Sequence, residues 1–142
     1  MIFKIWRWIV VVLLAIYAVI SVGIPGTALF YKINAELPQA IAPEMGALIQ
    51  SMHELQIFSW LLALLLYLAA AVLLARKRAT SIIVAVLGSA LDVGQWISLK
   101  YFGDAYDAAF SSGQQAFDWS LFGFLAFIVG SMITLKALNK ID

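Results

Sequence analysis

Four long apolar stretches constrain this chain more than any other feature of its sequence. They cover approximately Ile5–Phe30, Ile57–Ala75, Thr80–Tyr101 and Phe117–Leu138. A helix needs about 20 mainly apolar residues to cross the roughly 30 Å hydrocarbon core of a bilayer, so all four are candidates to span it. A chain of 142 residues that is 64% hydrophobic cannot hide this much apolar surface in a soluble core. The sequence therefore predicts an all-α, polytopic membrane protein built as a bundle of four transmembrane helices.

The apolar stretches favour helices over barrel strands, because they do not alternate apolar with polar residues and do not stop after about ten residues. We expect one transmembrane domain covering residues 1–142. The first stretch is longer than the apolar core of a signal peptide, so it is interpreted as a retained helix. The chain has no cysteine, which excludes disulfides, thiolate metal ligands and a catalytic cysteine.

The small net charge of +1 hides a strong asymmetry in the positions of the cations. Most of them flank the same side of the four spans: Lys4, Arg7, Arg76, Lys77, Arg78, Lys136 and Lys140. Cytoplasmic loops carry an excess of lysine and arginine, so both termini are predicted to lie in the cytoplasm. We expect a multi-pass protein of the plasma membrane, with the bacterial inner membrane as the first choice.

Short interfacial helices are expected in both outer loops. Pro43 and Glu44 are typical of a helix start, so the helix of the second span is predicted to begin near residue 43 and to continue through that span. A further short helix is predicted for residues 35–41. In the other outer loop, Tyr106 and Phe110 are four residues apart, which also favours a short helix.

A proline interrupts the first span near its outer end. Pro25 lacks a backbone N–H and crowds the preceding turn, so a kink or a break is expected there. We interpret it as a bend that packs the helix over its neighbour rather than as a hinge.

Asp92 is the most informative single residue, because it lies deep in the third span. A carboxylate at such a depth costs about 2.5–3.5 kcal/mol on insertion scales, and acids of this kind usually face the bundle interior or a partner protein. Helical spacing puts Ser89, Gln95 and Trp96 on the same face as Asp92. This face is therefore predicted to form an intramembrane polar site.

The other spans offer Asp92 hydrogen-bond donors but no counter-charge. Tyr17 and Ser21 on the first span lie at a matching depth, with Tyr67 on the second span as a further hydroxyl and Trp60 and Trp96 as indole donors. Because no cation lies at that depth, we expect Asp92 to be largely protonated unless a cation or a partner reaches it. Both a proton-coupled site and a purely structural neutral acid fit this pattern.

A second group of candidates lies at the outer membrane boundary. His53, Glu54 and Asp118 are interpreted as the outer mouth of a path to Asp92, with Trp60 further along the second span. A water-exposed interfacial histidine is the simpler alternative for His53. One histidine and no histidine–carboxylate cluster at metal spacing predict neither a metal nor a cofactor.

Small residues form a seam on the fourth span. Gly123, Ala126 and Gly130 include a small-xxx-small pattern, which permits close approach of two helices. The seam could be buried inside one chain or form a contact between copies, and the sequence leaves both possibilities open.

The function is constrained mainly by absent motifs. The chain carries no nucleotide-binding loop, hydrolase elbow or metalloprotease motif, so no catalytic residue is predicted, and it has no basic surface for nucleic acid. The leading hypothesis is a small membrane accessory or subunit protein. It would pack with a partner, or with itself as a homo-oligomer, through the Asp92 face or the Gly123–Gly130 seam.

Two alternatives remain beside this hypothesis. One is a small proton- or cation-coupled transporter or channel that uses Asp92 as a relay. The other is a lipid- or quinone-binding membrane enzyme, with His53, Glu54 and Trp60 near the headgroup level. The lipid bilayer is an expected partner in every case.

Overall fold

All regular structure in the described part of the chain is helical. The computed structural model describes residues 2–102, 105–110 and 112–142, and side chains for residues 2–101, 105–110 and 119–142. The helices are α1 (Ile2–Ile20), α2 (Gly23–Asn34), α3 (Pro43–Ser51), α4 (Glu54–Ala75), α5 (Thr80–Phe102), α6 (Tyr106–Ala109) and α7 (Ser112–Ala137). The predicted all-α class is confirmed.

Four helical segments are long and apolar enough to cross a membrane. They are Ile2–Asn34, Glu54–Ala75, Thr80–Tyr101 and Trp119–Ala137. Each one overlaps a predicted span. The largest difference is at the first span, whose helical segment includes α2 and extends to Asn34.

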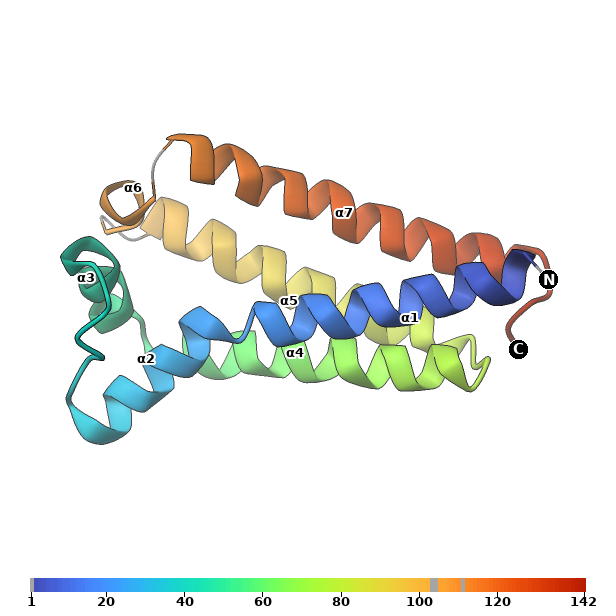
Figure 1. The fold of residues 1–142 in the computed structure, drawn as a ribbon, viewed down its shortest axis with the longest axis horizontal. Coiled ribbons are helices and arrows are strands. Elements are labelled where there is room, and N and C mark those ends of the chain that lie inside the picture. The colour runs from blue at the N-terminus through green and yellow to red at the C-terminus, as the bar shows by residue number, and fades with distance from the viewer. Residues whose placement is uncertain (1, 103–104, 111) are drawn as a thin grey trace.

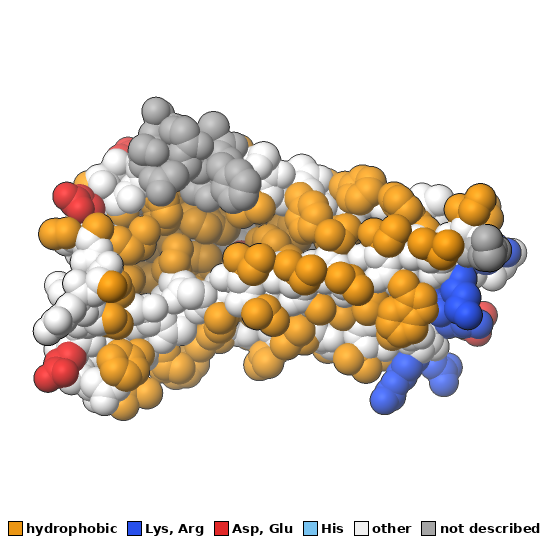
Figure 2. Space-filling view, viewed as in Figure 1, with side chains coloured by type: hydrophobic (Ala, Val, Ile, Leu, Met, Phe, Trp, Pro, Cys, Tyr) orange, Lys and Arg blue, Asp and Glu red, His pale blue; other side chains and the backbone are white. Residues whose placement is uncertain are grey.

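The four long helices run side by side along the longest axis of the molecule, with α3 lying across one end (Figure 1). Helix α6 contacts α3 at that end, which is called the capped end below. Both chain termini and the α4–α5 turn lie at the opposite, terminal end. Lysine and arginine side chains gather at the terminal end, and acidic side chains are seen mainly at the capped end (Figure 2).

The first span breaks into α1 and α2 at residues 21–22. Pro25 has no N–H to donate to the carbonyl of Ser21, four residues earlier, and its ring crowds that carbonyl. The expected kink or break near Pro25 is therefore confirmed, and it lies one turn before the proline.

The prediction of one continuous helix from residue 43 through the second span is wrong. Helix α3 begins at Pro43 as expected, but it ends at Ser51. Met52 and His53 are extended, with ψ of 129° and 148°, and α4 begins at Glu54. The backbone N–H of His53 donates to Gln56 Oε1 over 2.8 Å, so a side chain in the first turn of α4 satisfies the group at the break.

The helix expected at residues 35–41 is also not observed. Ala35 takes a left-handed conformation with φ of 56° and caps the end of α2. Its N–H donates to the carbonyl of Tyr31 over 2.8 Å, which closes that helix. The short helix expected around Tyr106 in the second loop is present as α6.

Helices α4 and α5 approach each other closely at Gly88. A Cβ placed on Gly88 would lie 3.2 Å from the carbonyl oxygen of Ala63 and 3.3 Å from Tyr67 Cδ1. Only a residue without a side chain allows the two backbones to come this close. Helix α1 packs on α4, while α7 contacts α1 and α5.

The end of the chain returns to the α4–α5 turn. Asp142 donates its N–H to the carbonyl of Lys77 over 2.6 Å, and Ala79 donates to the carbonyl of Asp142. Ile141 is buried beside this pairing. The segment after α7 is thereby held to the α4–α5 turn.

Candidate functional site

Asp92 lies inside the bundle, on α5, with none of its surface exposed. Gly88 is one turn earlier on the same helix and contacts α4. The close approach at Gly88 therefore puts the Asp92 carboxyl between α4, α5 and α1 rather than in lipid.

Two tyrosine hydroxyls donate to the same oxygen of Asp92. The Tyr17 hydroxyl lies 2.6 Å and the Tyr67 hydroxyl 3.1 Å from Asp92 Oδ2. The Tyr67 hydroxyl is also 3.4 Å from Ser89 Oγ. The two tyrosine rings meet edge to face, with centroids 5.3 Å apart. One carboxyl oxygen thus joins α1, α4 and α5, and Asp92, Tyr17, Tyr67 and Ser89 are called the Asp92 cluster below.

Two buried acceptor oxygens on α5 have no hydrogen-bond partner in the described part of the chain, Asp92 Oδ1 and Gln95 Oε1. The Trp60 indole of α4 lies against the Asp92 carboxyl, but its buried N–H meets no acceptor in hydrogen-bond geometry among the described residues. Leaving a buried polar group without a partner costs about 1–3 kcal/mol, so such atoms are uncommon in folded proteins. Asp92 therefore has one oxygen engaged by two hydroxyls and a second without a hydrogen bond among the described residues.

An aromatic layer lies on the side of Asp92 toward the capped end. Trp60 of α4 meets Trp96 of α5 edge to face at 5.2 Å. Trp96 in turn contacts Tyr106 at 6.0 Å and Phe110 at 5.6 Å. The predicted site residue Trp96 is thus part of a ring cluster that covers the bundle interior, and no bond from it to Asp92 is present among the described contacts.

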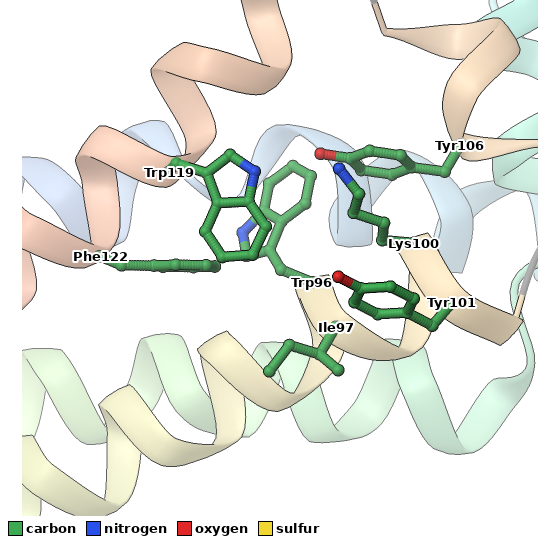
Figure 3. Close-up of a pocket in the computed structure, with 7 residues that line it drawn as sticks. All are labelled: Trp96, Ile97, Lys100, Tyr101, Tyr106, Trp119 and Phe122. Carbon is green, nitrogen blue, oxygen red and sulfur yellow. The ribbon is translucent and has the colours of Figure 1, made fainter.

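A small pocket beside this layer does not open a route to Asp92. Its lining residues are Trp96, Ile97, Lys100, Tyr101, Tyr106, Trp119 and Phe122 (Figure 3). Its volume is only about 10 Å³, close to the minimum for one water. Lys100 reaches into the space between two rings, with Nζ 5.7 Å from the centroid of Tyr106 and 5.4 Å from that of Trp119.

Of the expected outer-mouth residues, the structure brings Trp60 to Asp92, but not His53 or Glu54. His53 and Glu54 are exposed at the start of α4, whereas Trp60 is buried in the aromatic layer. The polar contact at this level is instead Gln56 Nε2 to Ser98 Oγ, at 3.0 Å. The side chain of Asp118 lies outside the described residues.

Ser21 stands apart from the Asp92 cluster. It lies at the break between α1 and α2, half-buried, and lines a lateral groove together with Tyr17 and Phe124. Among the described contacts it makes no hydrogen bond to Asp92. Of the two first-span candidates, only Tyr17 is a partner of the acid.

The small-residue seam of α7 faces outward. Gly123, Ala126 and Gly130 are all exposed. A Cβ placed on Gly123 or on Gly130 would have no other atom within 4 Å. The seam is therefore not buried inside this chain, and a contact between copies stays a prediction.

Sequence reasoning gave too little weight to Tyr67 and missed the burial of Arg7. Arg7 is only 7% exposed, and its Nε has no hydrogen-bond partner in the described part of the chain. It continues the buried stripe of α1 that includes Val10, Leu14 and Tyr17. That i, i+3, i+7, i+10 spacing is visible in the sequence and could have placed Arg7 on the inner face.

No protein-family model matches the chain, and no curated protein or solved structure matches it either. Within the described ranges, no group of three or more His, Asp or Glu side chains could hold a metal ion. The function is therefore inferred from the chain's own side chains.

Proposed function

We propose that this chain is a small accessory protein of the plasma membrane, in bacteria the inner membrane, with four spans and both termini in the cytoplasm. Large apolar side chains exposed along the long helices support membrane insertion, among them Val12, Leu65, Ile83 and Ile133. The cluster of lysine and arginine at the terminal end supports this orientation (Figure 2).

The accessory protein packs against a partner helix or a second copy of itself through the α7 seam. The observation that carries this proposal is the outward position of Gly123 and Gly130, with no neighbouring atom within 4 Å of a Cβ at either. In lipid, small residues of this kind allow backbones to approach and supply the packing that holds helices together. The Asp92 face is occupied within the chain by Tyr17 and Tyr67, so the contact is assigned to the seam.

The absence of cysteine makes a direct test possible, because an introduced thiol is the only one in the chain. In native membranes, Ala126→Cys should form a cross-linked product, either a homodimer or an adduct with a partner. The matched control Leu65→Cys lies on the outward face of α4, is 62% exposed and should not cross-link. Equal cross-linking of both variants, or of neither, would overturn the seam as the contact surface.

A second candidate function is a proton or cation relay at Asp92. It is favoured by Asp92 Oδ1 and Gln95 Oε1, two buried acceptors without a partner in the described part of the chain. In sealed liposomes, Asp92→Asn would then abolish a proton or cation flux that the unchanged protein supports. Glu36→Gln, which neutralises an exposed acid in the loop after α2, is the control. A flux that survives Asp92→Asn would reject the relay.

The third function considered, a lipid- or quinone-binding enzyme, gains no support from the site. Its suggested residues His53 and Glu54 are exposed, while Trp60 is buried against Trp96. These side chains do not share a pocket among those found in the described residues.

A further inference from the structure

A groove runs along the interface of α1 and α7 to the terminal end of the molecule. Its volume is about 600 Å³, and its walls include Phe3 and Trp6 on α1, Phe127, Ser131 and Thr134 on α7, and Leu138 directly after α7. From Phe127 to Leu138 it follows about 16 Å of helix at 1.5 Å rise per residue. This length suits a large part of one extended acyl chain.

The groove is apolar and open toward the surroundings. Trp6 and Phe127 meet edge to face at 5.7 Å across the helix interface. Gly130, a further lining residue, has no neighbour within 4 Å of a Cβ placed on it, so its wall is not filled by the chain. The Thr134 hydroxyl donates to the Gly130 carbonyl over 2.9 Å and is therefore satisfied within α7. The groove offers dispersion contacts to an apolar occupant.

A cation stands at the terminal end of the groove. Lys140 Nζ lies 5.5 Å from the ring centroid of the lining residue Phe3. The surrounding surface is also basic, as Figure 2 shows at the terminal end. An apolar groove that ends at a cation is complementary to an amphiphile with an apolar tail and an anionic head.

We propose that this groove binds one acyl chain of an anionic phospholipid, with the lipid phosphate next to Lys140. The inference rests on membrane insertion of the chain, and Gly130 is the one residue that the groove shares with the seam. A zwitterionic phospholipid offers the same tail and phosphate, but its own ammonium offsets the phosphate charge, so it should gain less from Lys140.

The contribution of the Lys140 charge to lipid selectivity is tested by native mass spectrometry. The detergent-solubilised full chain is mixed with equal amounts of phosphatidylglycerol and phosphatidylcholine. The unchanged protein should retain phosphatidylglycerol preferentially. Lys140→Gln should lower that retention about fivefold, the effect of one cation near a membrane surface, and lower the retention of phosphatidylcholine by less. Lys136→Gln makes the same charge change on α7 without lining the groove, and it should have no effect.

Binding of the acyl chain in the groove is tested by filling the groove with a tryptophan side chain. Thr134→Trp should reduce retention of both lipids at least tenfold, whereas Ile133→Trp, at a neighbouring exposed position that does not line the groove, should not. Leu138→Trp narrows the same groove and replaces Thr134→Trp if that variant does not fold. Equal retention of the two lipids by the unchanged protein would overturn the proposal. So would equal losses in Lys140→Gln and Lys136→Gln, or full retention after the groove is filled.

Discussion

The interface between α4 and α5 and the edge formed by α7 are held by different chemistry. Between α4 and α5, a glycine brings the backbones together and polar side chains connect them, through Tyr67 with Asp92 and Gln56 with Ser98. Helix α7 instead meets α1 through rings, such as Trp6 with Phe127, and turns Gly123 and Gly130 outward.

This difference has a physical consequence in a bilayer. Apolar side chains gain little by moving from lipid to another helix, so close packing and hydrogen bonds decide which helices stay together. The α4–α5 pair has both, and Tyr17 adds α1 to it. Helix α7 is bordered by grooves on its α1 side, so it offers surface to other molecules.

The largest difference in stability is expected between leucine variants of the interface glycine Gly88 and the exposed glycine Gly123. Gly88→Leu should lower the free energy of unfolding by about 3 kcal/mol, because the new side chain meets backbone of α4 that cannot move aside. Gly123→Leu should change the stability of the monomer by less than about 0.5 kcal/mol. Equilibrium unfolding in mixed micelles measures both. Equal losses would remove the distinction between the two regions.

Removing the acid should have the next largest effect. Asp92→Leu leaves the hydroxyls of Tyr17 and Tyr67 buried without their acceptor, which should cost about 2 kcal/mol of unfolding free energy. Asp92→Asn keeps an oxygen acceptor and should cost less than about 1 kcal/mol. If both variants unfold like the unchanged protein, the acid does not join the three helices.

Smaller effects are expected from the two tyrosines. Tyr17→Phe and Tyr67→Phe should each cost about 0.6–1.5 kcal/mol, the range for hydrogen bonds between helices in lipid. Tyr17→Phe should also speed hydrogen exchange in α1 more than in α5, because it removes the hydrogen bond that joins α1 to Asp92. Tyr101→Phe is the control, since Tyr101 is 66% exposed. Faster exchange in α5 than in α1 would contradict this assignment.

The smallest effect is expected at the start of α4. Gln56→Leu removes the acceptor of the His53 N–H and the donor to Ser98, so it should cost about 0.5–1 kcal/mol. Hydrogen exchange should increase around His53 but not in α7. Gln50→Leu, at an exposed position of α3, should leave exchange unchanged.

The number and type of the long helices could be predicted, because apolar length alone decides them. The break at Met52–His53 could not, since it depends on which groups are satisfied locally: Met52 is buried, and the His53 N–H finds the Gln56 side chain. The same holds for Ala35, whose left-handed conformation closes α2 where no glycine marks the end. Hydrophobic periodicity carries no such information.

The candidate site was predictable only where depth and helical spacing define it. Tyr17 and Ser89 were identified in this way, and both lie in the Asp92 cluster. The outward direction of the Gly123 seam could not be deduced, because in lipid both faces of a helix are apolar and no polar face marks the outside. His53 was proposed as a site residue because it is polar and lies near the membrane boundary. It is exposed, so such a position alone does not identify a site residue.

The shared oxygen of Asp92 also sets an order of assembly. Tyr67 is 25 residues from Asp92 and Tyr17 is 75 residues away, so the shorter loop closes at the lower entropic cost. During synthesis the α4–α5 hairpin can therefore shelter its carboxyl with Tyr67 as soon as α5 emerges. Helix α1 then docks onto a hairpin in which Tyr67 and Asp92 are already paired. Helix α7 is synthesised last, and the Asp92 hydrogen bonds to Tyr17 and Tyr67 do not require it.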